Sequence, residues 1–162
     1  MKGFLAVVFM LAFGAEVANA GDGSLTWRSF DEGIAEAKKV NKKILIDIYT
    51  DWCSWCKVMD AKTYSDKNVI EYLSKKYVLI KLNAESAKKL TYKKQQLTER
   101  ELAAGFGITG YPSTLFLNAD GEPITVYPGF ADASKFKMVT SFIAEDHYLN
   151  TKFEDYASRY KD

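Results

Sequence analysis

The only two cysteines of the chain lie three positions apart, in the segment Trp52-Cys53-Ser54-Trp55-Cys56-Lys57. A β-branched apolar run ends at Tyr49, and a helical pattern follows the first cysteine. Residues at i and i+3 of a helix share a face, so the two sulfurs can join. Cys53 is expected at the helix N-terminus, where free N–H groups and the dipole favour a thiolate, and Cys56 one turn inside and less accessible. The pattern predicts thiol–disulfide exchange in which Cys53 attacks and Cys56 resolves the mixed disulfide.

Two other uses of the cysteines stay open. A purely structural disulfide across so short a loop would stabilise the fold by roughly 2 kcal/mol, against nearly 5 for a hundred-residue loop. A metal site needs more ligands, and His147 lies far away in the sequence, where a solvated surface position is expected. A two-thiolate Cu(I) site remains an alternative, because soft thiolates suit that ion.

Composition excludes several other classes of protein. The 162 residues are 48% hydrophobic and 27% charged, as in a packed globular domain. The net charge of +1 gives no support to nucleic-acid binding, which needs a basic excess. One histidine excludes a two-histidine zinc motif, and two cysteines exclude both a four-thiolate zinc site and a disulfide framework.

The first twenty residues have the pattern of a secretory signal peptide. Lys2 gives a positive start, residues 4–13 form an unbroken apolar run, and Ala18-Asn19-Ala20 has the small-x-small form of a cleavage site. The apolar run is too short for the roughly twenty residues that span a bilayer. We therefore expect a signal peptide over 1–20, a mature domain over 21–162, and export to the periplasm.

Hydrophobic periodicity predicts one α/β domain without an internal repeat. The capping boxes at 29–32 and 98–101 mark two helix starts. Helices are expected over 30–40, from Cys53 to about Lys62, after Asp66, from Thr98 to near Gly105 or Gly107, and after Asp132, with a short docked helix carrying Phe153, Tyr156 and Tyr160 at the end. Strands are expected over 44–49, 77–82, 114–117 and 123–127. The lysine-rich segment Ala84–Gln96 has no clear strand period, and we expect an excursion or an extra helical turn there.

Two segments resemble landmarks of the thioredoxin-fold family. Residues 46–57, around the cysteine pair, are similar to the family's active-site segment, and residues 106–114, Phe-Gly-Ile-Thr-Gly-Tyr-Pro-Ser-Thr, are similar to its cis-proline loop. The resemblance covers roughly Trp27 to Leu149 and lies nearest to the exported thioredoxin-like disulfide reductases of bacteria, including the C-terminal domain type of DsbD. It implies a thioredoxin-like α/β fold with a central mixed β-sheet flanked by helices.

The resemblance also implies roles for single residues. Cys53 is the nucleophile and Cys56 the resolving thiol of a redox disulfide. Asp47, six residues before Cys53, matches a buried carboxylate that accepts the proton of Cys56, and Lys81 matches the lysine beside that carboxylate. The expected substrate-binding residues are Trp52, Trp55, Tyr111 and Pro112. A proline at this place leaves the Tyr111 backbone free to pair with a substrate strand.

The pair Ser54-Trp55 stands where ordinary thioredoxins have Gly-Pro, and it contains no histidine that would stabilise a Cys53 thiolate. We therefore expect a reductase of protein disulfides, supplied with electrons by a membrane thiol donor. An oxidase or isomerase, and a copper-binding or adaptor module, remain the alternatives. We expect a monomer, with no cofactor, no bound metal and no nucleic-acid partner.

Overall fold

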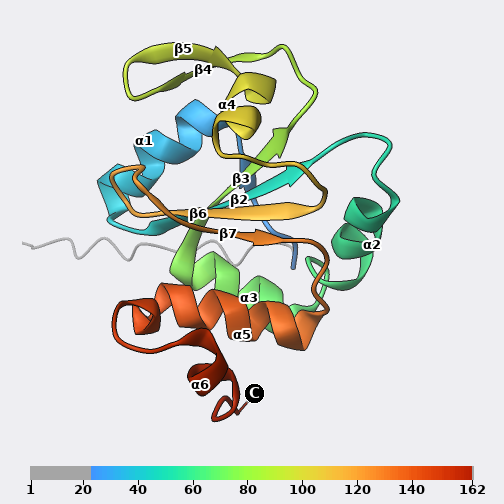
Figure 1. Cartoon of the computed structure of the whole chain (residues 1–162), viewed down its shortest axis with the longest axis vertical. Coiled ribbons are helices and arrows are strands. Elements are labelled where there is room, and N and C mark those ends of the chain that lie inside the picture. The colour runs from blue at the N-terminus through green and yellow to red at the C-terminus, as the bar shows by residue number, and fades with distance from the viewer. Residues whose placement is uncertain (1–22, 162) are drawn as a thin grey trace, which may run out of the picture.

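A computed structural model describes residues 23–161 of the chain (Figure 1). The expected signal peptide over 1–20 and its cleavage site lie outside the described residues. The helices and strands are β1 (Trp27–Arg28), α1 (Phe30–Val40), β2 (Lys43–Tyr49), α2 (Ser54–Lys62), α3 (Lys67–Lys76), β3 (Tyr77–Asn83), β4 (Lys89–Tyr92), β5 (Gln95–Thr98), α4 (Glu99–Gly105), β6 (Ser113–Leu117), β7 (Pro123–Pro128), α5 (Ala133–Ala144), the 3₁₀ turn η1 (His147–Leu149) and α6 (Phe153–Ala157).

The central sheet has five strands in the order β1-β3-β2-β6-β7. The strands β1, β3 and β2 run parallel, while β6 is antiparallel to β2 and β7 is antiparallel to β6. The expected mixed sheet is therefore confirmed. Because β2 lies in the middle and is buried on both faces, it reads in the sequence as a nearly continuous apolar run.

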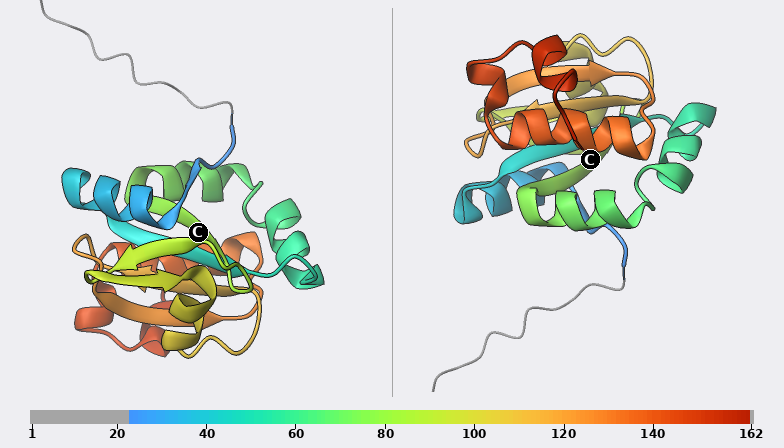
Figure 2. Two further views of the ribbon diagram at one scale, coloured as in Figure 1. Left: turned by 90° about the horizontal axis from the view of Figure 1, so that it is seen from above. Right: turned by 90° about the horizontal axis from the view of Figure 1, so that it is seen from below.

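Each face of the sheet carries its own hydrophobic cluster. Alternate residues of β2 point to opposite faces, so that Ile44, Ile46 and Ile48 pack with α1 and α4, whereas Leu45 packs with α3 and α5. The ribbon views show the same arrangement, with α3 and α5 together on one face and α1 and α4 on the other (Figure 2). The result is a three-layer domain in which β2 delivers its carboxyl end directly to the cysteine segment.

Both predicted capping boxes are formed. The Ser29 backbone N–H donates to the Glu32 carboxylate at 3.2 Å, and Thr98 and Glu101 exchange hydrogen bonds of 2.7 and 3.1 Å. Asn41 ends α1 in the left-handed conformation, with a φ of 52°. These local signals therefore set the boundaries of α1 and α4 as expected.

Ala84–Gln96 is an excursion from the central sheet, but it contributes the two-stranded hairpin β4–β5, so the expected lack of strands and the alternative of a helical turn are wrong. Leu90 is buried against α1 and α4, while the lysines and glutamines face outward. The turn residues Lys93 and Lys94 both have positive φ, of 47° and 68°. Such a two-residue turn usually contains Asn-Gly or Asp-Gly. Because two lysines stand here instead, the sequence gives no signal for a hairpin.

Two smaller features complete the described chain. The two-residue strand β1, too short to leave a period in the sequence, pairs with β3 at Leu79 and Ile80. The expected short C-terminal helix is present as α6, whose Phe153 and Tyr156 contact Phe142 of α5. Over residues 23–161 none of the helices has the length and apolarity that a membrane span requires.

Candidate active site

The cysteines form a disulfide at the start of α2. Cys53 and Cys56 are bonded, with their Cα atoms 5.3 Å apart. Cys53 is the N-cap residue of α2, and its Sγ accepts a hydrogen bond of 3.1 Å from the backbone N–H of Cys56. An N–H donor at a helix N-terminus stabilises negative charge on sulfur. The fold thus favours the thiolate form of Cys53 once the disulfide is reduced.

The expected difference in exposure between the two cysteines is wrong for the disulfide form. Both residues are 4% exposed. The disulfide lies below a rim of larger side chains, among which Trp52 and Trp55 are 65% and 57% exposed. The hydrogen bond that Cys53 accepts therefore distinguishes the two cysteines, whereas their exposed fractions do not.

A shallow apolar groove lies beside the disulfide. Its volume is about 320 Å³, and it is lined by Trp55, Tyr111, Pro112, Gly129 and Phe130. The Tyr111–Pro112 peptide bond is cis, and the Pro112 carbonyl accepts a hydrogen bond of 2.8 Å from the Gly129 N–H. The structure thus brings together Trp55, Tyr111 and Pro112, and it adds Phe130, whose ring lies 5.3 Å from that of Trp55.

Trp52 precedes Cys53 in the sequence and lies next to the groove. Its ring contacts Tyr111 edge to face, with the centroids 5.9 Å apart. Its indole N–H donates a hydrogen bond of 2.9 Å to the carboxylate of Glu85, in the connection between β3 and β4. Sequence reasoning missed Glu85, which is one of many exposed charged residues and has no spacing relation to the cysteines.

Asp47 lies on β2 and is 2% exposed. Its Oδ2 is 3.6 Å from the Lys81 Nζ on β3, whereas its Oδ1 has no hydrogen-bond partner among the described residues. Burial raises the pKa of Asp47 to about 6, although the Lys81 charge opposes that shift. A carboxyl with this pKa exchanges a proton near neutral pH, as general-base catalysis requires.

Lys81 is shared between two carboxylates. Besides Asp47 it contacts Asp60 of α2, with 2.5 Å between Nζ and Oδ1. Its ammonium group also lies 5.3 Å from the ring centroids of Trp27 and Tyr49. Asp60, four residues after Cys56, was missed because a carboxylate on the outer part of a helix is ordinary in sequence. The negative charge of Asp60 also raises the pKa of Asp47.

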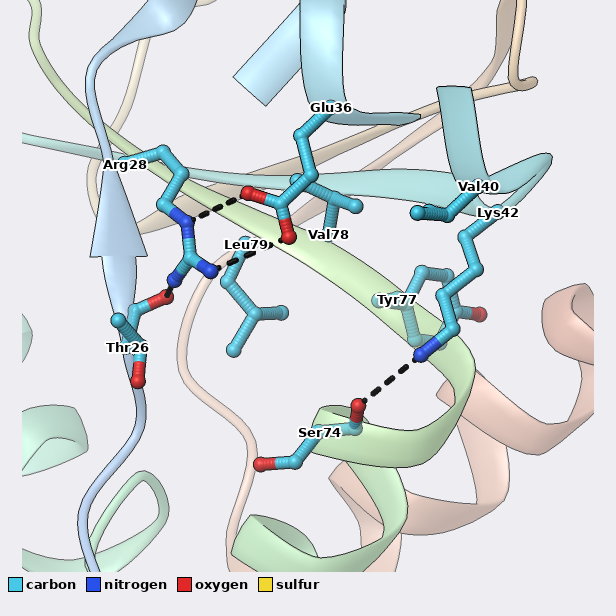
Figure 3. A pocket seen from close by; sticks show the side chains of 9 residues that line it. All are labelled: Thr26, Arg28, Glu36, Val40, Lys42, Ser74, Tyr77, Val78 and Leu79. Carbon is cyan, nitrogen blue, oxygen red and sulfur yellow. Dashed lines mark hydrogen bonds and ion pairs between the residues drawn. The ribbon is translucent and has the colours of Figure 1, made fainter. Parts of the chain in front are cut away.

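Other features of the described residues lie apart from this site. A pocket of about 190 Å³ lies between β1, α1 and the end of α3 (Figure 3). Its charged side chains form ion pairs or hydrogen bonds with other residues of the pocket. Arg28 pairs with Glu36 at 2.8 Å, and Lys42 donates to the Ser74 carbonyl. His147 stacks on Tyr156 near the C-terminus. Within residues 23–161 no cluster of three or more His, Cys, Asp or Glu residues is arranged for a metal ion.

A mixed sheet that delivers a Cys-x-x-Cys disulfide to a helix N-terminus, opposite a cis-proline loop, defines the class of thioredoxin-like thiol–disulfide oxidoreductases. The Thioredoxin-like domain model matches residues 30–144. The chain therefore belongs to the thioredoxin-like family.

Known proteins add detail to this assignment. The thiol:disulfide interchange protein DsbD of Vibrio cholerae is 32% identical over 117 residues, which is 72% of this chain but only 16% of that protein. Among solved structures, DsbH oxidoreductase gives a TM-score of 0.61 at 19% identity, covering 75% of this chain and 85% of its own. A thioredoxin from Thermus thermophilus gives 0.58 at 21% identity, covering 80% and 90%. The two structural matches establish the fold.

Proposed function

We propose that the protein reduces disulfide bonds of exported proteins with the Cys53–Cys56 dithiol. The proposal rests mainly on one observation, a disulfide at a helix N-terminus whose intervening residue Trp55 lines an apolar groove. A buried carboxyl of raised pKa, Asp47, lies on the strand that leads to this helix. The groove offers apolar contacts to a polypeptide, and the backbone beside Pro112 offers an edge for an extended segment.

The reaction has two exchange steps. The Cys53 thiolate attacks one sulfur of the substrate disulfide, the substrate S–S bond breaks, and the first substrate thiolate leaves. Cys56 then loses its proton to Asp47, and its thiolate attacks the Cys53 sulfur of the mixed disulfide. The second substrate thiolate leaves, so the substrate gains two electrons and the Cys53–Cys56 disulfide is regenerated.

The proposed direction of electron transfer is supported by the groups around the Cys53 sulfur. Strong oxidants stabilise their reduced form by stabilising the thiolate. Here one backbone N–H donates to the Cys53 sulfur, and Ser54-Trp55 adds no cationic group. The reduced form of the Cys53–Cys56 pair should therefore be less stabilised than the reduced form of a strong oxidant. A dithiol that is less stabilised gives up its electrons more readily, so the pair should act as an electron donor. A membrane thiol carrier would supply them, in line with the similarity to DsbD.

Export to the periplasm is part of the same proposal. Its support is the signal-peptide pattern of residues 1–20 and the similarity to DsbD. Intact-mass analysis of the protein from its own compartment should give a chain that begins at Gly21. A chain that begins at Met1 and remains in the membrane would contradict export.

Two measurements test the activity. Purified protein should accelerate the reduction of insulin by dithiothreitol, whereas a redox-inert adaptor would not. The reduction potential of the Cys53–Cys56 pair should lie near the thioredoxin value of about −270 mV, and a value near −120 mV would indicate an oxidase. Stoichiometric retention of Cu(I) against a strong chelator, without insulin reduction, would favour the copper-binding alternative.

A further inference from the structure

A row of polar side chains crosses the sheet beneath α2. Asp47 on β2 is the register partner of Lys81 on β3 and of Thr114 on β6. Residues at one register level of neighbouring strands point to the same face, so this row lies within the apolar cluster under α3 and α5. Tyr64, from the connection between α2 and α3, is packed into the same cluster.

Packing fixes the Tyr64 ring. The residue is 6% exposed, and its ring contacts Trp27 and Phe136 edge to face at centroid distances of 4.9 and 5.4 Å. Its backbone N–H donates to the Met59 carbonyl at 3.0 Å. The hydroxyl oxygen is itself buried, and the Trp27 ring against which Tyr64 packs lies 5.3 Å from the ammonium group of Lys81. Tyr64 therefore lies close to the polar row.

Three buried oxygen atoms in this place have no hydrogen-bond partner among the described residues. They are Asp47 Oδ1, the Tyr64 hydroxyl and Thr114 Oγ1. Unpaired buried polar atoms are rare and destabilising, so those that persist call for an explanation. The groups also influence one another. Burial and, after it, the Asp47 charge raise the pKa of Tyr64, while Thr114 opposes that shift; the Tyr64 hydroxyl in turn opposes the rise that burial causes in the pKa of Asp47. Tyr64 thus stays a neutral hydroxyl, able to donate.

We propose that Tyr64 is a positioning residue, whose hydroxyl donates a hydrogen bond to the ionised carboxylate of Asp47 and thereby favours the proton-accepting form. This inference deepens the proposed function, since it rests on Asp47 as the acceptor of the Cys56 proton. No sequence spacing marks Tyr64, and its role comes from a neighbour seventeen residues away in the chain.

Other charged or titratable groups also face Asp47. Lys81 of β3 favours the carboxylate, while Asp60 of α2 and the burial itself favour the protonated form. Tyr49 of β2 also interacts with the Asp47 charge. The proposed function adds the thiol of Cys56 after reduction. Any test of Tyr64 must therefore leave these groups in place.

The direct test is the replacement Tyr64→Phe in the otherwise unchanged oxidised protein. The titration of the Asp47 carboxyl, followed by ¹³C NMR, should shift upward by about one pH unit, because a donor to a charged group is lost. If proton transfer limits the reaction, insulin reduction should fall about fivefold at pH 6 and about twofold at pH 7, and return to the wild-type rate near pH 9.

Tyr77→Phe is the matched control. Tyr77 is also a buried tyrosine of this cluster, but its hydroxyl donates to the Thr140 carbonyl at 2.6 Å. Its replacement should lower stability without moving the Asp47 titration. In an Asp47→Asn background, Tyr64→Phe should change the rate no further, because the group through which it acts is gone.

An unchanged Asp47 titration in folded Tyr64→Phe would overturn the inference. If that variant does not fold, 3-fluorotyrosine at position 64 keeps the ring and strengthens the donor, so the titration should shift downward, and no shift would equally overturn it. A shifted titration together with a normal reduction rate for Asp47→Asn would leave the positioning role standing and show that the proton step of the proposed function is wrong.

Discussion

The carboxylate of Asp47 lies 3.6 Å from the ammonium group of Lys81, yet its pKa is raised to about 6 and not lowered. Two features account for this. The carboxyl is buried, which penalises its charged form, and Lys81 shares its charge with Asp60. Desolvation therefore outweighs the ion pair, and the site holds a carboxyl that titrates near neutral pH.

Replacing Asp47 by asparagine should slow insulin reduction at pH 7 by about tenfold or more, since general acid–base catalysis typically contributes about 10²- to 10⁴-fold. The two proteins should converge near pH 9, where Cys56 ionises without help. Steady-state rates from pH 6 to 9 measure this. The exposed Asp120→Asn, in the turn between β6 and β7, is the control and should match the wild type. Equal rates for Asp47→Asn at every pH would exclude Asp47 from the mechanism.

The same substitution should stabilise the oxidised protein at neutral pH. Asp47 has a pKa of about 6 in the folded protein and 3.8 as its ordinary value. The folded state therefore binds the proton more tightly, so this group lowers stability as the pH rises from about 4 to 6. The full loss above pH 6 is about 3 kcal/mol.

Urea unfolding at pH 4 and pH 7 measures that effect. Asp47→Asn should gain stability relative to the wild type at pH 7 by up to about 3 kcal/mol more than at pH 4. Asp60→Asn is the comparison. The Asp60 carboxylate contacts the same lysine, but its side chain is 45% exposed and not buried. A stability difference for Asp47→Asn that is the same at both pH values would contradict the prediction.

The two cysteine variants should behave differently toward substrates. A Cys56→Ser protein can attack a disulfide but cannot release it, so mixed disulfides should accumulate. A Cys53→Ser protein should trap little, because Cys56 lacks the N-cap position that favours a thiolate. Non-reducing gels and mass spectrometry identify the adducts, and the double variant is the control. Equal trapping by both single variants would reverse the assigned roles.

Phe130→Ala should weaken the binding of protein substrates. Phe130 lines the apolar groove and contacts Trp55, and an aromatic pair is worth about 0.5–1.5 kcal/mol beyond its buried area. The KM for insulin should rise about two- to tenfold, while exchange with dithiothreitol, which needs no groove, should be unchanged. Leu149→Ala removes an exposed apolar side chain that does not line the groove and should change neither. An unchanged KM for Phe130→Ala would show that substrates bind elsewhere.

The amino-acid sequence by itself determined the features that depend on near neighbours. The Cys53–Cys56 spacing, the capping boxes at Ser29 and Thr98, and the apolar run of β2 are set within a few residues of the backbone, so they could be read directly. The resemblance at the cysteines and at Pro112 then predicted the thioredoxin-like fold.

Only the tertiary structure decided which distant side chains meet. The carboxylate of Asp60 contacts Lys81, and that of Glu85 accepts a hydrogen bond from Trp52, through strand register and loop paths. The hairpin turn at Lys93 and Lys94, and the equal burial of the two cysteines, also depend on packing partners far along the chain. No local pattern records such contacts, because they follow from how the elements pack and not from the conformation of any one of them.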